Sequence, residues 1–288
     1  MSESIRNSSE IIRPSQKAVV PLPAIDRPQT SAPAKRAKIG VLIRFSNSAE
    51  TLPDVLAALE GQTLRPDHIL GIDSGSRDGS RTLIEQAGGK VINWTQRYHH
   101  SEVLNFGISH LKTDLILVLS SHTVLESPET LARMVEAMRD QNTACVSLKW
   151  DQDPFYSDAI DWTELGMKGL KFGSIYSNSM GMIRRKFWMS QKFDESLPTA
   201  EDYAWSLGQI RQGHLCRRLE LPFRYSRGGS SRDFEFAQVV FALARKHRLK
   251  VTWLGLRATL SALLKALMRG ESSAALHRAR LKACFRAI

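Results

Sequence analysis

Short apolar runs alternate with helical stretches from Lys38 to Trp150, and this alternation constrains the fold more than any other feature. The runs that read as strands cover 39–43, 68–73, 90–94, 115–119 and 144–150. Between them, apolar residues recur at the spacing of amphipathic helices. Continuous apolar runs of this length are typical of parallel strands that are buried on both faces. The pattern therefore predicts an α/β fold of the Rossmann-like class, an open and mostly parallel sheet with helices on both faces.

The two ends of the chain differ from this region. Residues 1–37 hold five of the eleven prolines and few large apolar residues, which predicts a disordered N-terminal arm. The formal net charge is +11, and residues 245–288 carry eleven Lys and Arg against one acid. We expect a basic amphipathic helical tail over 233–288. Its segment 245–288 either docks on an anionic membrane surface or caps the domain.

The sequence also bears on location. It has no apolar run long enough to span a bilayer and no apolar core of a signal peptide near its N-terminus. We therefore expect a cytoplasmic protein, either free or peripheral on the inner face of the membrane. Cys145 and Cys216 lie in apolar, strand-like contexts and should be buried thiols, because the cysteine spacing fits neither a disulfide nor a metal site.

Polar residues follow the predicted strands at the end where ligands bind in such sheets. Arg44 and Asn47 follow the first strand, the stretch "DSGSRDG" starts at Asp73 after the second, and "SSH" from Ser120 closes the fourth. The N–H groups and hydroxyls of a loop such as "DSGSRDG" can hold a nucleotide, while its carboxylate accepts from a base or ribose. The same loop is also common as plain helix capping, so both readings stay open at this point.

Four ordered blocks of the chain resemble family 2 glycosyltransferases, which have the GT-A fold. They are "IGVLIRFSNSAETLPDVLAALEGQTLRPDHILGIDSGSRDGS", "HHSEVLNFGISHLKTDLILVLSS", "SNSMGMIRRKFWMSQKFDESLP" and the following "TAEDYAW". The resemblance covers roughly 38–225. It implies a catalytic domain over 38–232, with a nucleotide-binding half at 38–125 and an acceptor half at 126–232. It also implies inverting transfer of a sugar from a nucleotide-sugar donor to a hydroxyl of a glycan or lipid-linked acceptor.

The resemblance assigns roles to particular residues. By position, the nucleotide-binding residues are Arg44, Asn47, Asp73, Ser76 and Asp78. The pair Glu201-Asp202 should be catalytic, with Asp202 as the general base that deprotonates the acceptor hydroxyl and Glu201 orienting either Asp202 or the acceptor. Trp205 could stack on an acceptor sugar or pack in the core. The "DQD" stretch that ends at Asp153 follows the fifth strand, so its position favours the acceptor side over a metal site.

One departure from the family concerns the metal. The family's fourth strand normally ends in Asp-x-Asp, which offers oxygens to Mg²⁺ or Mn²⁺ beside the diphosphate. Here Ser120 and His122 stand in those places, as in a branch that resembles polysaccharide-assembly transferases. His122 could ligate a divalent cation, contact the phosphates directly when protonated, or serve the structure alone. The stretch after the last strand has Arg227 and no histidine, and an arginine there could clamp the diphosphate.

Two other functions compete with an active transferase. The missing carboxylates would suit a catalytically inactive GT-A-like module that scaffolds an assembly complex. The sequence pI of 9.8 would suit a nucleic-acid-binding protein. The latter is weaker, because the positive charge is confined to the tail and no basic and aromatic reading surface is present, so we expect no nucleic-acid partner.

Overall fold

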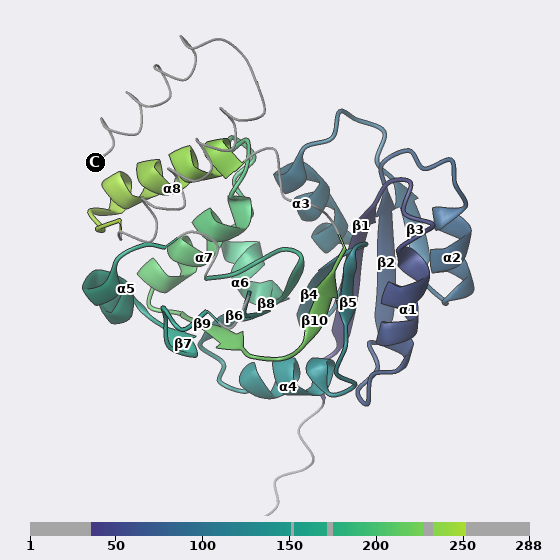
Figure 1. The fold of residues 1–288 in the computed structure, drawn as a ribbon, viewed down its shortest axis with the longest axis horizontal. Helices are drawn as coiled ribbons and strands as arrows, with labels where there is room; N and C mark the ends of the chain where they lie inside the picture. The colour runs from purple at the N-terminus through teal and green to yellow at the C-terminus, as the bar shows by residue number, and fades with distance from the viewer. Residues whose placement is uncertain (1–35, 151–152, 172–174, 227–232, 252–288) are drawn as a thin grey trace, which may run out of the picture. The chain divides into compact units, whose positions relative to one another are not determined.

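The computed structural model describes residues 36–150, 153–171, 175–226 and 233–251, which build a mixed sheet covered by helices on both faces (Figure 1). In chain order the elements up to residue 148 are β1 (Ile39–Phe45), α1 (Leu52–Glu60), β2 (His68–Asp73), α2 (Ser80–Gln86), β3 (Lys90–Asn93), α3 (His100–His110), β4 (Leu115–Ser120), β5 (Thr123–Leu125), α4 (Thr130–Ala137) and β6 (Thr143–Leu148). The later elements are β7 (Ala159–Ile160), α5 (Trp162–Lys168), β8 (Met180–Arg184), α6 (Arg185–Ser190), α7 (Glu201–Arg211), β9 (Leu215–Leu219), β10 (Phe223–Tyr225) and α8 (Asp233–His247). Residues 1–35 of the predicted arm and the tail from residue 252 lie outside the described residues.

The main sheet has the strand order β3-β2-β1-β4-β8-β6-β9-β7. Strands β3, β2, β1 and β4 run parallel to one another, as do β6 and β9. The exception in the middle is β8, which pairs antiparallel with both β4 and β6. The sheet is therefore mixed and mostly parallel, and it confirms the predicted GT-A class with helices on both faces.

The side chains of the central strands divide between two apolar cores, one on each face of the sheet. Val41 and Ile43 of β1 pack into the core that α1, α2 and α4 cover, whereas Leu42 packs into the core that α3, α6 and α7 cover. This is the two-residue period expected of a strand buried on both sides. At Gly107 of α3, an added Cβ would lie 2.5 Å from Leu42 Cδ1, so only glycine allows α3 to approach β1 this closely.

The second half contains elements that the sequence pattern did not predict. Strands β7 and β8 and helices α5 and α6 lie in 151–198, which reads as irregular in the sequence. The short strand β5 was also missed, because its three residues are too few to give a periodic signal. In the structure Ser127 closes a turn to Thr130, and α4 begins at Thr130 with Glu129 as its N-cap.

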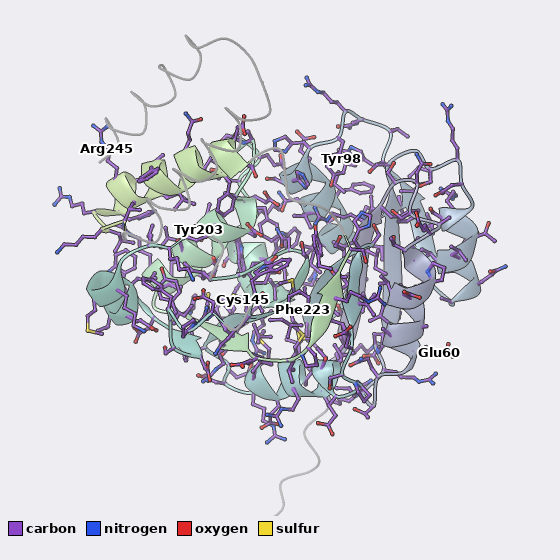
Figure 2. All side chains as sticks on the ribbon, in the orientation of Figure 1. Glu60, Tyr98, Cys145, Tyr203, Phe223 and Arg245 are labelled. Atoms are coloured by element: carbon purple, nitrogen blue, oxygen red, sulfur yellow. The ribbon has the colours of Figure 1, made fainter. Side chains whose placement is uncertain are left out.

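Other expectations hold in the described part of the chain. Cys145 of β6 and Cys216 of β9 are paired in register and fully buried, as expected for core thiols (Figure 2). Burial, and then the neighbouring Cys216, raises the pKa of Cys145 well above its ordinary value. The first part of the helical tail that was expected over 233–288 is present as α8, which packs against α7. No helix in the described segments combines the length and apolar character needed to cross a bilayer.

Candidate functional site

The polar strand ends meet at one edge of the sheet. Phe45 pairs with Asp73, and Arg44 pairs with Ser120, so the ends of β1, β2 and β4 are neighbours. Because β8 is antiparallel, it begins at this same edge, where the Ser120 N–H donates to the Ser179 carbonyl at 3.0 Å. The site thus draws residues from both halves of the chain, as predicted for the carboxyl ends of parallel strands.

Asp73 organises the loop that follows β2. Its Oδ1 accepts from the N–H groups of Gly75 at 3.1 Å and Ser76 at 2.8 Å, and its Oδ2 lies 3.4 Å from Nη1 of Arg81. The side chain is buried. The carboxylate therefore fixes the loop conformation through one oxygen and holds a cation, Arg81, with the other.

The predicted nucleotide loops after β1 and β2 are joined by reciprocal hydrogen bonds. The Asn47 N–H donates to Ser76 Oγ at 3.0 Å, and the Asn47 Oδ1 accepts from the Arg77 N–H at 2.9 Å. Asp78 accepts from Ser80 and, at 2.9 Å, from the Ala49 N–H, and these hydrogen bonds hold the pKa of Asp78 below its ordinary value. The side chains of Asn47, Ser76 and Asp78 thus all brace the two loops against each other.

The carboxylate pair opens α7 after a sharp turn. Ala200 adopts the left-handed conformation with φ of 61°, which is uncommon for a residue with a Cβ, and α7 begins directly after it. Asp202 Oδ2 accepts from the Asn178 N–H at 3.1 Å, and Glu201 Oε1 accepts from Asn178 Nδ2 at 3.2 Å. Asn178 lies just before β8 and therefore connects α7 to the sheet edge.

The acidity of Asp202 is strongly altered by its surroundings. Burial, and then the charge of Glu201, raises its pKa to about 7, although hydrogen bonds from Asn178 and Tyr203 and the cation Arg44 lower it. Two backbone N–H groups, those of Asn178 and Tyr203, fix the two carboxylate oxygens. A carboxylate with a pKa near neutral pH is well suited to accept a proton from a hydroxyl.

Arg44 lies beside the carboxylate pair. Its Nη1 contacts His100 Nδ1 at 2.9 Å and donates to Tyr98 Oη at 3.4 Å, and its Nη2 donates to the Asn178 carbonyl at 3.3 Å. Burial alone would lower its pKa, but Tyr98, Glu201 and Asp202 raise it above the ordinary value. Arg44 thus holds a permanent positive charge near Glu201 and Asp202, and its guanidinium is turned to these groups rather than to the Asp73 loop.

The end of β4 packs on the loop before α1. The hydroxyl of Ser120 accepts from the His122 N–H at 3.3 Å, and that of Ser121 lies 3.0 Å from Ser48 Oγ. The imidazole Nδ1 of His122 lies 3.4 Å from Thr51 Oγ1.

The described residues supply no group of three or more His, Cys, Asp or Glu that could hold a metal ion. One imidazole and one hydroxyl at the end of β4 do not by themselves fit a divalent-cation site, for which Mg²⁺ and Mn²⁺ favour oxygen-rich donor sets. Arg227, the predicted diphosphate clamp, lies outside the described residues. The nearby Arg224 pairs with Asp54 at 3.0 Å and with Glu126 at 3.8 Å.

Two residues that were expected on the acceptor side, Asp153 and Trp205, are buried and bond to other residues of the protein. Asp153 is buried, with Oδ1 bonded to Lys171 Nζ and Oδ2 lying 3.4 Å from Nη1 of the buried Arg218. Trp205 is 1% exposed, and its Nε1 donates to the Gln191 carbonyl at 2.6 Å. Trp205 therefore packs in the core, and both carboxylate oxygens of Asp153 contact cationic side chains of the protein. "DQD" residues 151–152 lie outside the described part of the chain.

Asn105 joins two of the sequence blocks that carry the resemblance. Its Nδ2 donates to the Phe193 carbonyl and to Glu195 Oε1, each at 2.9 Å. Its Oδ1 accepts from Trp188 Nε1 at 3.0 Å and from the Phe193 N–H at 3.1 Å. The Asn-x-Gly helix, the Arg-Arg-x-x-Trp helix and the Phe-Asp-Glu loop therefore meet at one buried amide. This contact fixes the segment that leads into α7.

Sequence reasoning missed several participants. Nothing in the sequence marks Asn178, since its role depends on an antiparallel strand that the pattern did not reveal. Tyr98 and His100 stand in a stretch rich in aromatic residues, but their contact with Arg44 is tertiary and is not visible in the sequence. The positively charged residue at the second position of "SRTLIEQ" could have suggested Arg81 as the partner of Asp73.

Comparison with known proteins identifies a matching family model and a related protein sequence. The model of "Glycosyl transferase family 2" matches residues 41–197, more than half of the chain. A curated relative is the O-antigen chain rhamnosyltransferase RfbN of Salmonella typhimurium, 25% identical over 195 residues. That match covers 62% of this chain and 62% of the relative, so the chain spans less than two thirds of the relative's length.

Solved structures share the fold at low sequence identity. The mannosyltransferase PcManGT of Pyrobaculum calidifontis, in complex with GDP-Man and Mn²⁺, is 18% identical with a TM-score of 0.59, over 89% of this chain and 82% of that one. TarS of S. aureus is 15% identical with a TM-score of 0.56, over 78% of this chain and 41% of that one. Glucosyl-3-phosphoglycerate synthase of Mycobacterium tuberculosis is 16% identical with a TM-score of 0.53, over 75% and 82%. Because the family model matches more than half of this chain, the chain belongs to glycosyltransferase family 2.

Proposed function

We propose that the protein is an inverting glycosyltransferase that moves a sugar from a nucleotide-sugar donor to a hydroxyl of a glycan or lipid-linked acceptor. The observation that carries this proposal is Asp202: a carboxylate held by two backbone N–H groups, with a pKa near 7, at the sheet edge that also carries Asp73. In inverting transfer one carboxylate deprotonates the acceptor hydroxyl as it attacks the anomeric carbon from the side opposite the leaving nucleotide. No covalent intermediate with the enzyme is formed.

The neighbouring groups have supporting roles in this mechanism. Asn178 orients both members of the carboxylate pair, since its N–H and its amide each donate to one of them. Arg44 stabilises the charged form of Asp202 and so keeps the pKa from rising further. The Asp73 loop would receive the nucleotide, with Asn47, Ser76 and Asp78 maintaining its shape.

Whether the protein binds a divalent cation does not follow from its fold. The Pyrobaculum and Mycobacterium enzymes were solved with Mn²⁺. In this chain His122 is the group at the end of β4 that could ligate such an ion, but the carboxylates of Asp-x-Asp are replaced by Ser120 and His122. We assign no step to a metal. His122 is instead proposed as a group that contacts the diphosphate, and the same role for Arg227 is proposed from the sequence alone.

The pathway is proposed from the curated relative. RfbN is described as an O-antigen chain rhamnosyltransferase, which supports surface polysaccharide assembly as the setting. A cytoplasmic location and a membrane contact through 245–288 are further parts of the proposal. Residues 252–288 lie outside the described structure, so the membrane contact is supported by the sequence alone.

A thermal-shift panel tests the donor half of the proposal. UDP-, GDP- and dTDP-sugars are each added with and without Mn²⁺, and a nucleotide that binds only the folded state raises the melting temperature by mass action. We expect at least one nucleotide series to do so, and the Asp73→Ala variant to lose the shift. If no nucleotide stabilises the protein under either condition, an inactive scaffold module becomes the better reading.

A further inference from the structure

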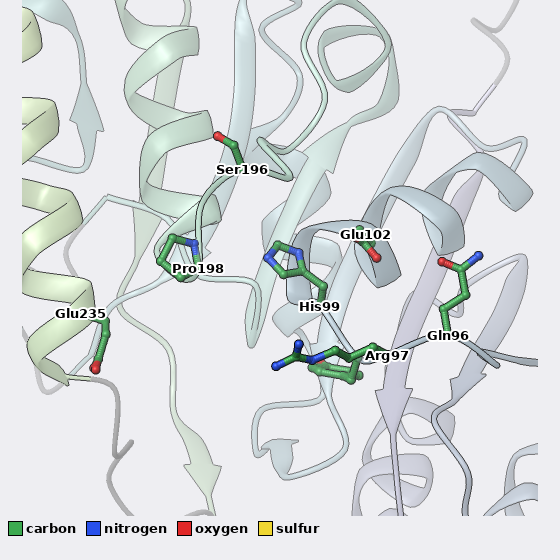
Figure 3. Close-up of a pocket in the computed structure, with 8 residues that line it drawn as sticks. Gln96, Arg97, His99, Glu102, Ser196, Pro198 and Glu235 are labelled. Carbon is green, nitrogen blue, oxygen red and sulfur yellow. The ribbon is translucent and has the colours of Figure 1, made fainter.

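A cavity of about 570 Å³ lies between the start of α3 and the segment that leads into α7 (Figure 3). On one side are residues of the 96–99 loop and Glu102 of α3, and on the other are Ser196, Pro198 and Glu235 of α8. Its volume is within the range of ordinary small-ligand pockets. Asn105 fixes the two sides relative to each other, because it joins α3 to the 193–195 segment. The cavity is therefore a preformed feature of the fold.

Two polar atoms of residues that line this cavity are buried without a hydrogen bond. They are Nδ1 of His99 and Oε2 of Glu235, neither of which has a partner among the described residues. A buried polar group left unpaired costs roughly 1–3 kcal/mol, so such groups call for an explanation such as a ligand or water. Glu235 offers an acceptor, and the imidazole nitrogen offers a donor or an acceptor according to its tautomer.

The charges around the cavity distinguish between possible ligands. Glu102 and Glu235 are acidic, and Arg97 is the basic residue among those that line it. Two carboxylates against one guanidinium disfavour a diphosphate, which carries negative charge of its own. Carboxylate, imidazole, amide and guanidinium groups together can instead bond the many hydroxyls of an uncharged sugar. Tyr98, which is 40% exposed, adds an aromatic ring on which a sugar face can pack.

A short chain of hydrogen bonds connects this cavity to the carboxylate pair. Tyr98 accepts from Arg44 at 3.4 Å, Arg44 donates to the Asn178 carbonyl at 3.3 Å, and the Asn178 N–H donates to Asp202 at 3.1 Å. The chain segment that carries Ser196 and Pro198 also runs directly into Ala200 and α7. A ligand held in the cavity thus contacts residues bonded to the groups that position Asp202.

We propose that this cavity binds an uncharged pyranose unit of the acceptor, with Glu102, Glu235 and His99 as residues that determine acceptor specificity. The proposal rests on the proposed transferase function and adds a location and a chemical class for its acceptor. It also gives α8 a part in substrate binding, since Glu235 lies beyond the segment that the family model matches.

Saturation-transfer difference NMR on the full-length protein tests this directly. The probes are the methyl α-glycosides of mannose, rhamnose, galactose and glucose, with methyl glucuronoside as an anionic comparison. At least one neutral glycoside should receive saturation, and the glucuronoside should receive less. The signal should fall at least tenfold in the double variant Glu102→Ala, Glu235→Ala and also weaken in His99→Asn, which keeps a side chain favoured at a helix N-cap.

The matched control is Glu60→Ala, which removes an exposed acid at the end of α1 (Figure 2). It should leave the NMR signal unchanged. The nucleotide thermal shift should be the same in the wild type, the double variant and the control. The proposal is overturned if no neutral glycoside binds, if binding survives the double variant, or if the glucuronoside binds best.

The nucleotide measurement separates the two levels of inference. Loss of the nucleotide shift in the double variant would assign the cavity to the donor and overturn the acceptor proposal. A wild-type protein that binds a glycoside but no nucleotide would instead count against the transferase function, while the sugar pocket itself would stand.

Discussion

The two sides of the site differ in how their polar groups are satisfied. In the loops after β1 and β2, the side chains of Asn47, Asp73 and Asp78 bond to backbone N–H groups of the same two loops. Around the carboxylate pair and the cavity, buried atoms lack partners among the described residues: Arg44 Nε, Asn178 Oδ1, His99 Nδ1 and Glu235 Oε2. In the two loops after β1 and β2, Ser74 Oγ is the only buried polar side-chain atom of the described structure that lacks a hydrogen-bond partner. The proposed nucleotide side is therefore self-braced, whereas the proposed acceptor side retains buried polar atoms without a partner among the described residues.

The largest effect is expected from Asp202→Asn, which removes the base and keeps the shape of the side chain. Transfer should fall by about 10²–10⁴-fold, the usual contribution of a general base. The nucleotide thermal shift should not fall, because the proposed donor loops do not depend on Asp202. Initial rates of sugar transfer measure the effect, with Glu60→Ala as the control. Unchanged transfer from every donor tested would remove Asp202 from the mechanism.

Asn105→Ala should give the next largest change, in stability. The substitution leaves the buried donors Trp188 Nε1 and the Phe193 N–H without their acceptor. With about 1–3 kcal/mol for each unpaired group, we expect a loss of roughly 3 kcal/mol in the free energy of unfolding. Urea denaturation measures it. If the loosened segment matters to the acceptor side alone, acceptor KM should rise in the folded variant while the nucleotide affinity stays constant.

The pH dependence of transfer should reveal the raised pKa of Asp202. Only the deprotonated carboxylate can accept a proton, so kcat/KM, which reports on the free enzyme, should fall about tenfold per pH unit below pH 7 and level off above it. A raised pKa in the folded state also means that the folded protein retains a proton that the unfolded chain has lost. Stability from this group therefore decreases as the pH rises from about 4 to about 7. Asp202→Asn should flatten that part of the melting-temperature profile, and an unaltered profile would contradict the assignment.

The smallest effect, a change in stability, is expected from substitutions of Asn47 in the loop after β1. Asn47 has a φ of 47°, which glycine adopts freely and alanine does not. Asn47→Ala should therefore lower the free energy of unfolding by about 1 kcal/mol more than Asn47→Gly does. Thermal denaturation of the two variants measures the difference. Equal stabilities would mean that the loop relaxes on substitution, and the contrast between the two sides would then be weaker.

The sequence predicted the first half of the fold well because its signals are local. All of the strands from β1 to β4 are apolar runs, and the intervening helices show apolar residues at helical spacing. The second half was harder for a physical reason. Strand β8 is buried at every position and antiparallel to both neighbours, and no local pattern tells where in a sheet such a strand inserts.

The residues of the candidate site also differ in whether the sequence could predict them. Asp73 and Glu201-Asp202 were placed by motifs that occupy a few consecutive residues. Asn178 and the contacts of Arg44 came only from the structure, because they join segments that are far apart in sequence. Asp153 shows the opposite case: its position after β6 suggested a substrate contact, but its surroundings are the cations Lys171 and Arg218.

The central position of β8 has a consequence for biosynthesis. During synthesis the nucleotide half emerges from the ribosome first, and β4 then presents one open edge of unpaired backbone groups. That edge is covered only when β8 has been made, about 60 residues later along the chain. A nascent or truncated chain that ends before Met180 would expose an apolar, aggregation-prone strand. The first half of this enzyme is therefore expected to need either the second half or a chaperone to remain in solution.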